Sequence, residues 1–162
     1  MRKITMKYVG YIQSPIGILR IQVCEMGLER IDFVEEILDR EIPNPLLNEV
    51  KLQMHQYFKG ERRGFKIPLH PQGTHFQMNV WEELVKIQYA HTQNYEEIAR
   101  RLGDIKTIRA AANANGRNPI PFVIPCHRVI GKSGDLTGYS GGVWRKKWLL
   151  EHESKERQPR LW

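Results

Sequence analysis

The sequence has little cysteine and no long hydrophobic run. Its 162 residues include only Cys24 and Cys126, too few for the disulfide framework of a small secreted domain. No apolar stretch reaches the roughly 18 residues of a membrane-spanning helix, and the basic N-terminal segment lacks the apolar stretch of a signal peptide. Internal repeats and low-complexity tracts are also missing. These absences predict a soluble, cytoplasmic protein whose thiols stay reduced.

The composition is that of a globular protein with surplus positive charge. Hydrophobic residues make up 41% and charged residues 27% of the chain, and the formal net charge is +7. Residues 1–72 carry a net charge of +2 and residues 73–162 a net charge of +5. Excess positive charge attracts polyanions through counterion release, so nucleic acid is a candidate partner of the second half. Many basic proteins, however, are only made soluble by their charge.

The first 72 residues are expected to form a small sheet and one helix. Apolar and polar residues partly alternate in three runs before residue 35, and residues 14–17 have turn composition. Asn44-Pro45 then opens a segment with apolar residues at helical spacing, which ends at Gly60. A short strand around residues 65–67 is expected to complete the sheet. Prolines follow at 68 and 71, and we place a domain boundary near residue 72.

The second half is expected to be mostly helical. Thr74 is a candidate N-cap, and Asn94 with Glu97 three residues later resembles a capping box. Gly103 ends the second helix, and Asp104 can cap the next, so residues 94–116 have the pattern of a helix-turn-helix. The predicted fold class is α/β (α+β), with a small N-terminal sheet-plus-helix domain, residues 1–72, packed on a mostly helical domain, residues 73–162.

A helix-turn-helix pattern alone does not establish DNA binding, because most helix corners only pack against a core. Arg109 lies near the middle of the second helix, beside small residues at 110–112. Small side chains let a helix approach a groove closely, while an arginine can reach into it. The alternative is that Arg109 is a solvated surface charge.

The segment around Cys126 carries the chemistry. Asn118-Pro119 and Pro121 should hold the chain out of a helix, and residues 122–124 have the pattern of a short buried strand. A free thiol is only a few per cent ionised near neutral pH, so a nucleophilic Cys126 needs a base.

His127 is the nearest candidate base. Because neighbours in an extended chain point to opposite faces, either a bend or a bridging water must join it to the thiol. A later carboxylate such as Glu153 could orient the imidazole. The alternative is a buried cysteine beside a solvated histidine.

Residues 125–131, PCHRVIG, resemble the signature of the methylated-DNA–protein-cysteine methyltransferases, also called 6-O-alkylguanine-DNA alkyltransferases. Further similar segments occur in the family's order and spacing: GTHFQMNVWEEL, NYEEIA, NANGRNPIP, GYSGG and WLLEHE. The resemblance covers residues 73–153 closely and residues 1–72 loosely. It implies DNA repair in which an alkyl group passes irreversibly from 6-O-alkylguanine, and from 4-O-alkylthymine, to the protein's own cysteine.

The resemblance also assigns roles to individual residues. The implied catalytic residues are the nucleophile Cys126, the base His127 acting through water, its support Glu153, the turn-holding Asn118, and Tyr95, whose hydroxyl donates toward the base or presses on a phosphate. The implied DNA-binding residues are Ala110, Ala111, Asn115 and Arg109, which fills the stack when a nucleotide is flipped out. The implied substrate-binding residues are Val129, Ser140, and the lid residues Tyr139 and Gly141.

The resemblance further implies a monomer that binds alkylated double-stranded DNA through the minor groove. It implies no cofactor, no metal, no membrane and no obligate protein partner, and a single turnover. The chain departs from the family pattern at Gln88 and Ala90, where the family commonly has Pro and Gly. It also has Asn94 where the family commonly has Ser, and Ala111 and Ala112 where Val and Gly are usual. Two rival functions remain: a damage-binding protein without chemistry, and an unrelated cysteine hydrolase.

Overall fold

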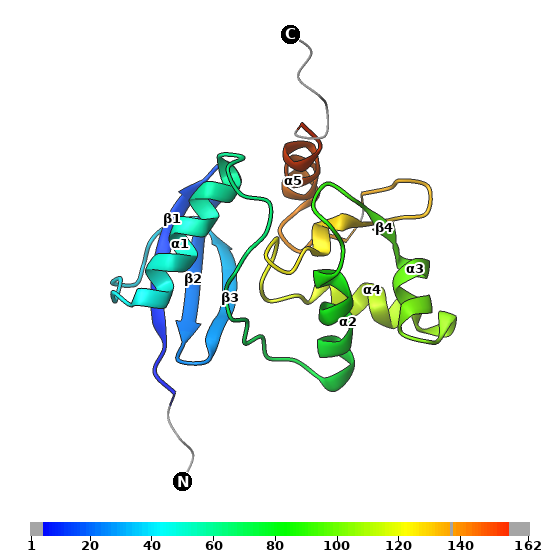
Figure 1. The fold of residues 1–162 in the computed structure, drawn as a ribbon, viewed down its shortest axis with the longest axis horizontal. Helices are drawn as coiled ribbons and strands as arrows, with labels where there is room; N and C mark the ends of the chain where they lie inside the picture. The colour runs from blue at the N-terminus through cyan, green and yellow to red at the C-terminus, as the bar shows by residue number, and fades with distance from the viewer. Residues whose placement is uncertain (1–4, 137, 156–162) are drawn as a thin grey trace. The chain divides into compact units, whose positions relative to one another are not determined.

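The computed structural model describes residues 5–136 and 138–155. The chain forms two compact units, Met1–Gln72 and Gly73–Trp162, whose elements are labelled in Figure 1. No helix formed by the described residues is both long and apolar enough to cross a lipid bilayer. The first unit holds an antiparallel sheet, and the second is mainly helical, as predicted from the sequence.

The first unit is built on a three-stranded antiparallel sheet. Its strands are β1 (Tyr8–Ser14), β2 (Gly17–Cys24) and β3 (Gly27–Val34), in that spatial order. Gly27 closes the second hairpin with a φ of 145°, and a Cβ atom at this position would lie 2.4 Å from the carbonyl oxygen of Pro68. Glycine is therefore required there, because the backbone of residues 68–69 passes too close for a side chain.

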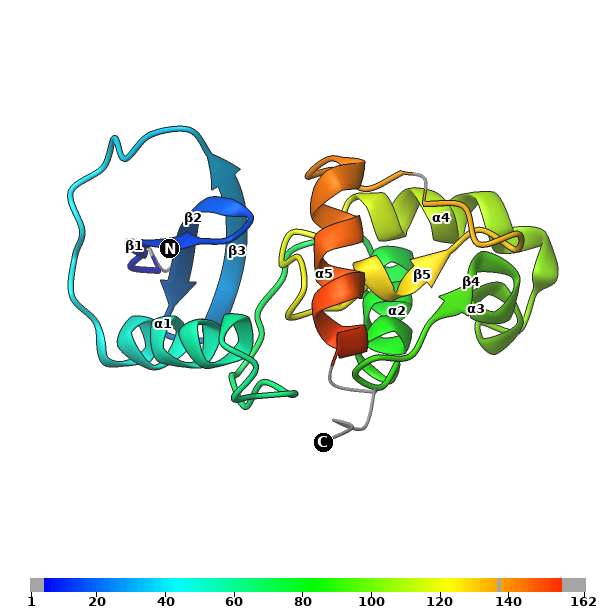
Figure 2. The ribbon, with the colours of Figure 1, turned by 90° about the horizontal axis from the view of Figure 1, so that it is seen from above.

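One helix, α1 (Pro45–Phe58), packs along the sheet (Figure 2). Asn44 caps it by accepting hydrogen bonds from the backbone N–H groups of Leu46 and Leu47, as the Asn-Pro start indicated. The buried side of the helix is apolar apart from Gln53. Together with the inner side chains of the sheet it forms the core of this unit, whose fully buried members include Ile16, Leu19, Ile21, Leu28, Leu47, Met54 and Tyr57.

The strand expected around residues 65–67 does not form. The backbone N–H and carbonyl of Lys66 are instead bound by the side-chain amide of Gln53, at 2.9 and 3.2 Å. A proline at 68 has no N–H to donate to a strand partner. Pairing with the sheet is limited to an isolated bridge between Leu28 and Leu69. The prediction was wrong because a side chain of α1 took the hydrogen bonds of this segment.

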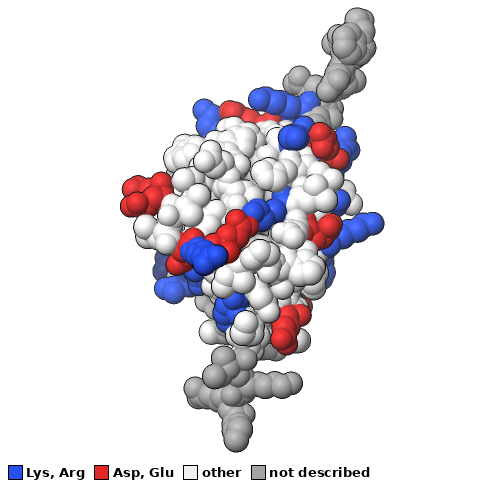
Figure 3. All heavy atoms as spheres, turned by 90° about the vertical axis from the view of Figure 1, so that its left-hand side faces the viewer, with Lys and Arg blue, Asp and Glu red and all other residues white. Residues whose placement is uncertain are grey.

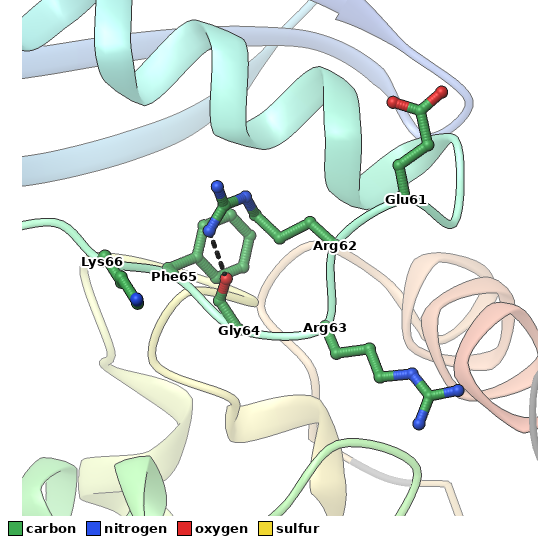
Figure 4. Close-up of a pocket in the computed structure, with 6 residues that line it drawn as sticks. All are labelled: Glu61, Arg62, Arg63, Gly64, Phe65 and Lys66. Carbon is green, nitrogen blue, oxygen red and sulfur yellow. Dashed lines mark hydrogen bonds between the residues drawn. The ribbon is translucent and has the colours of Figure 1, made fainter.

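The loop before Lys66 lines an open pocket of the first unit (Figure 4). Arg62 turns back along the loop and donates from Nη1 to the carbonyl of Gly64 at 3.0 Å, and from Nε to Gln56 at 2.8 Å. Several charged side chains elsewhere on this unit form ion pairs, among them Arg20–Asp39 and Lys51–Glu41. On the face in Figure 3, blue and red side chains accordingly lie close together, between wide uncharged areas.

The second unit contains the predicted helix-turn-helix. It begins with α2 (His75–Val85), capped by Thr74. A strand β4 (Gln93–Asn94) leads into α3 (Tyr95–Arg101), where Asn94 and Glu97 form the predicted capping box at 2.9 and 3.1 Å. Asp104 caps the short 3-10 turn η1 (Ile105–Thr107), which continues into α4 (Ile108–Gly116). The chain between the two helices is therefore short, and α3 packs against α4.

The remaining elements of the second unit contain the PCHR segment and the chain that follows it. These are the 3-10 turn η2 (Cys126–Arg128), the strand β5 (Val129–Ile130), which pairs in parallel with β4, and the helix α5 (Val143–Lys155). Trp81 of α2 is buried and donates from its indole N–H to the carbonyl of Ala114 in α4 at 2.9 Å. This hydrogen bond joins α2 to α4, and α2 also packs against the η2 turn, so buried contacts support the site from below.

Candidate active site

The residues before Cys126 form a tight turn instead of the expected strand. Phe122 has a φ of 55°, in the left-handed region, and successive short backbone hydrogen bonds close the turn on both sides of it. Asn118 lies inside this turn: its Oδ1 accepts from the N–H of Ile120 at 3.0 Å, and its Nδ2 donates to the carbonyl of Ile124 at 2.7 Å. The prolines on either side prevent the regular ladder that a strand needs.

The turn delivers Cys126 to the start of η2, where the chain is bent. The extended chain that we expected at Cys126 and His127 is therefore replaced by a 3-10 turn. Cys126 is only 4% exposed. Burial raises the pKa of its thiol, although hydrogen bonding with Asn118 and the charge of Lys146 act in the opposite direction. The resting thiol is therefore protonated at neutral pH, and attack requires a base.

His127 is completely buried and contacts Glu153 of α5, with Nε2 and Oε1 2.8 Å apart. An ionised carboxylate can only accept, so Nε2 carries the proton and Nδ1 keeps its lone pair. Burial lowers the pKa of His127 while Glu153 raises it, and the net shift is downward. The imidazole is therefore neutral at pH 7. Its Nδ1 has no hydrogen-bond partner within residues 5–136 and 138–155, which leaves a basic nitrogen in the site.

Glu153 is held by more groups than the sequence suggested. Arg128 donates from Nε to Oε2 at 3.0 Å and from Nη2 to Oε1 at 2.9 Å, and its Nη1 binds the carbonyl of Ile87 at 2.7 Å. Burial alone would raise the pKa of Glu153, but His127 and Arg128 lower it well below its usual range. The carboxylate is thus a permanent anion beside the imidazole.

Arg128 was not predicted as a site residue. The available signal was its place within PCHR, directly after the histidine, but an arginine is usually exposed and this one is 7% exposed.

The backbone N–H of Ala90 also donates to Glu153 Oε2, at 3.3 Å. To do so, Ala90 adopts a φ of 63°, a left-handed conformation that disfavours a residue with a Cβ atom. This explains physically why glycine suits the position, and it identifies Ala90 as a strained residue of this chain.

Two tyrosines lie near the thiol. Tyr95 opens α3 and is partly buried, and Tyr139, in the loop before α5, is 7% exposed. Burial and the charge of an ionised Cys126 raise the pKa of both hydroxyls, so both stay protonated and can donate. A Cβ atom on Gly138 would lie 4.0 Å from the Tyr95 hydroxyl, and one on Gly116 would lie 3.7 Å from the Gly138 carbonyl. The loop that carries Tyr139 therefore covers α3 and α4.

The other residues expected to bind substrate lie on this loop and on β5. Ser140 is exposed, whereas Gly141 is buried and its carbonyl accepts from Arg145 Nη1 at 2.6 Å. Val129 is fully buried, and its carbonyl accepts from Nζ of Lys146 at 2.6 Å. Lys146 was also missed in the sequence, although its spacing from Leu149 and Glu153 places all three on one face of a helix.

Of the four residues expected to bind DNA, two are exposed and two are buried. Arg109 and Ala110 are exposed on α4. Ala111 is 1% exposed and Asn115 is 4% exposed, and the Asn115 amide donates to the carbonyl of Cys126 at 3.4 Å. The side chains of Ala111 and Asn115 therefore face the core and the Cys126 turn. Helical periodicity turns 111 and 115 inward together, so Arg109 and Ala110 are the exposed members of the expected DNA-binding set.

This arrangement can transfer a group to sulfur. It combines a buried thiol, a neutral imidazole fixed by a carboxylate, and hydroxyl donors, all beside a helix with an exposed arginine. Residues 75–155 match the family model described as "6-O-methylguanine DNA methyltransferase, DNA binding domain". Residues 7–71 match "6-O-methylguanine DNA methyltransferase, ribonuclease-like domain". The chain belongs to the 6-O-methylguanine DNA methyltransferase family, which confirms the resemblance seen in the sequence.

Relatives match over nearly their whole length. The chain is 40% identical to the methylated-DNA–protein-cysteine methyltransferase of Methanosarcina acetivorans, over 90% of this chain and 97% of that protein. It is 40% identical to the constitutive Bacillus subtilis protein of the same name, over 90% and 93%. The crystal structure of Mycobacterium tuberculosis O6-methylguanine methyltransferase superposes with a TM-score of 0.84 at 40% identity, covering 96% of this chain and 97% of that one.

Proposed function

We propose that this protein repairs DNA by transferring a methyl or other alkyl group from 6-O-alkylguanine, and from 4-O-alkylthymine, to Cys126. The observation that carries the proposal is the buried thiol next to the His127–Glu153 pair, in a chain of this family. In the reaction, the Cys126 sulfur forms a bond to the alkyl carbon as the bond from carbon to the base oxygen breaks. The thioether product has no easy return path, so each molecule reacts once, without a cofactor.

His127 supplies the base for the thiol proton. Its Nδ1 has a lone pair because Nε2 is committed to Glu153, and a bridging water joins Nδ1 to the thiol. Glu153 holds the imidazole in this tautomer and stabilises the imidazolium that forms. Arg128 keeps the carboxylate ionised and in place. Asn118 fixes the turn from which the thiol projects.

The leaving group needs a proton. Breaking the carbon–oxygen bond leaves the electron pair on the base oxygen, which is a poor leaving group unless a donor meets the developing charge. Tyr95 and Ser140 provide such donors, Val129 and Cys126 offer carbonyls to the exocyclic amine, and Tyr139 with Gly141 covers the base. The proton that guanine gains balances the one that the thiol loses.

The substrate is proposed to be alkylated double-stranded DNA bound through the minor groove. A base in a duplex cannot reach a buried thiol, so the nucleotide must be extruded. Arg109, exposed on α4, fills the gap in the stack, and Ala110 lets the helix approach closely. A crystal structure of Mycobacterium tuberculosis OGT in complex with DNA, 42% identical with a TM-score of 0.81, supports DNA as the partner.

The first unit is proposed to have a mainly structural role, because the groups named above all belong to the second. We further propose that the protein acts as a monomer and in the cytoplasm, where a reduced thiol persists.

Intact-protein mass spectrometry tests the proposal. The protein is incubated with a duplex containing a single 6-O-methylguanine, and with the same duplex containing guanine. Transfer predicts a gain of one methyl mass per molecule with the first duplex and no gain with the second, and repair that stops at one equivalent. Tight binding without a gain in mass would establish the damage-binding alternative. Repeated hydrolysis of esters or amides would establish the hydrolase.

A further inference from the structure

Asn115 is a buried amide on the inner side of α4, where the other buried side chains are small and apolar. It is 4% exposed, and its buried neighbours on the helix are Ala111 and Ala114. A buried amide costs free energy unless its polar atoms are hydrogen-bonded. Packing alone therefore does not account for an asparagine at this position.

The carbonyl of Cys126 fixes the orientation of the Asn115 amide. The amide nitrogen Nδ2 lies 3.4 Å from that carbonyl oxygen. Because a carbonyl oxygen can only accept, the amide atom that faces it must be the nitrogen, and the reversed orientation would place two acceptors against each other. The amide oxygen Oδ1 is buried and has no hydrogen-bond partner among the residues that the structure describes. The amide therefore acts as a donor in this site.

The second neighbour of this amide is the hydroxyl of Tyr95. A Cβ atom on Gly138 would lie 4.0 Å from that hydroxyl oxygen. A Cβ atom on Gly116, the residue after Asn115, would lie 3.7 Å from the Gly138 carbonyl oxygen. The start of α3, the end of α4 and the loop that carries Tyr139 therefore meet around the Tyr95 hydroxyl.

The hydrogen bond between Asn115 and Tyr95 has a defined direction. Burial and the charge of an ionised Cys126 raise the pKa of Tyr95, whereas hydrogen bonding with Asn115 lowers it. Such a bond lowers the pKa of a hydroxyl when the hydroxyl oxygen accepts, because it then favours the phenolate. Since Oδ1 has no partner, the donor is Nδ2, which has a second hydrogen besides the one that faces Cys126. A hydroxyl that accepts this bond keeps its own hydrogen for another acceptor.

We propose that Asn115 is a positioning residue that donates its amide N–H to the Tyr95 hydroxyl oxygen and thereby directs the Tyr95 O–H toward the extruded base. The inference rests on the proposed function, in which Tyr95 donates to the base as the alkyl group leaves. If Asn115 presented its oxygen instead, Tyr95 would donate to the protein, and the base would lose that donor.

Two reactions of Cys126 with different leaving groups test this role. In transfer from a duplex containing 6-O-methylguanine, the sulfur forms a bond to the methyl carbon and the base oxygen leaves with the electron pair, so a donor to the base accelerates the step. In alkylation by iodoacetamide, the sulfur forms a bond to the methylene carbon and iodide leaves with the electron pair, which requires no donor. The thiol loses its proton in both reactions. A Cys24→Ser background restricts alkylation to Cys126.

Asn115→Leu keeps the volume of the side chain but removes the amide. At saturating DNA, its limiting single-turnover rate of transfer should fall about tenfold. Its rate with iodoacetamide and its half-saturating DNA concentration should stay within about twofold of the wild-type values. If this variant does not fold, Asn115→Ala is measured in the same way.

Asn113→Leu is the matched control. It makes the same change two residues earlier on α4, at an exposed side chain whose Oδ1 accepts from Nε of Arg117 at 3.1 Å. This variant should keep the wild-type rate in both reactions.

A double-mutant cycle distinguishes action through Tyr95 from a general structural effect. Tyr95→Phe removes the donor itself and should lower the limiting rate about a hundredfold. Asn115→Leu added to Tyr95→Phe should then change the rate by less than about twofold. An equal loss in both backgrounds would overturn the proposal, as would an equal loss with iodoacetamide or an effect confined to the half-saturating DNA concentration.

The wild-type protein separates this inference from the function on which it rests. If wild type transfers the methyl group and Asn115→Leu has the same limiting rate, the inference is wrong and the proposed function stands. A wild type that reacts with iodoacetamide but transfers no methyl group would overturn the proposed function itself.

Discussion

The two cysteines are buried to a similar extent but in different surroundings. Cys24, at the end of β2, is 2% exposed, and its sulfur accepts a hydrogen bond from the backbone N–H of Met26 at 3.3 Å. Cys126 is 4% exposed, but it lies in a bent turn beside His127 and Lys146. Burial alone therefore does not distinguish a structural thiol from a reactive one. The difference lies in which groups surround each sulfur: Cys24 hydrogen-bonds with the carboxylate of Glu29, whereas Cys126 lies near the base His127 and the cation Lys146.

Buried charged side chains also differ between the two units. Among the described residues of the first unit, the buried charged side chain is Glu29, and its partner Lys7 remains 46% exposed. In the second unit Arg128, Lys146 and Glu153 are all buried. A fold gains little stability from buried ion pairs and loses much when one partner is removed. The chemistry proposed for Cys126 accounts for their concentration in the second unit.

The largest expected effect is on stability, and it should differ between the two buried carboxylates, Glu153 and Glu29. Glu153→Gln leaves Arg128 buried without its anion and should lower the free energy of unfolding by about 3–5 kcal/mol. Glu29→Gln leaves Lys7 free to be solvated and should cost about 1 kcal/mol. Denaturant titration of both variants measures the difference. Equal losses would contradict the view that the two units treat buried charge differently.

The next largest effect is on the rate of repair, and it distinguishes the exposed Arg109 of α4 from the buried site around Cys126. Arg109→Ala should slow repair of a duplex lesion about tenfold or more, because the extruded nucleotide leaves a gap that nothing fills. Reaction with free 6-O-benzylguanine, which needs no extrusion, should keep its rate. Single-turnover kinetics with both substrates measure this, and Arg101→Ala, on the exposed side of α3, is the control for general charge. Equal slowing with both substrates would place Arg109 in another role.

The smallest effect concerns the strained contact to Glu153. Ala90→Gly should raise the free energy of unfolding by about 0.5–1 kcal/mol, because glycine adopts a φ of 63° without steric cost. The same change at Ala110, a helical position, should lower it by about 1 kcal/mol. Thermal unfolding of the two variants should therefore show shifts of opposite sign. A destabilised Ala90→Gly variant would argue against the strain.

Local signals in the sequence predicted much of the fold. Asn44, Thr74 and Asn94 cap their helices as expected, because capping depends on one side chain and the nearest backbone groups. The strand predicted at residues 122–124 was wrong, because the neighbouring prolines and Asn118 impose a turn that the apolar pattern does not reveal. The strand predicted at residues 65–67 was also wrong. Gln53, which is distant in sequence, forms the hydrogen bonds of the Lys66 backbone N–H and carbonyl.

The candidate site was predicted only in part. Cys126, His127 and Glu153 were singled out by chemistry and by resemblance, and the structure places the last two in contact. Arg128 and Lys146 were missed, since the usual expectation for long cationic side chains is exposure. The burial of Ala111 and Asn115 was not foreseen, because the sequence did not fix which face of α4 is buried.

Peptide-level mass spectrometry after reaction with a 6-O-methylguanine duplex tests the central claim most directly. Wild-type protein and Cys24→Ser should each carry one methyl group on the peptide that contains Cys126. Cys126→Ser should carry none and should leave the lesion in place. A methyl group on any other residue, or removal of the lesion by purified Cys126→Ser, would contradict the account.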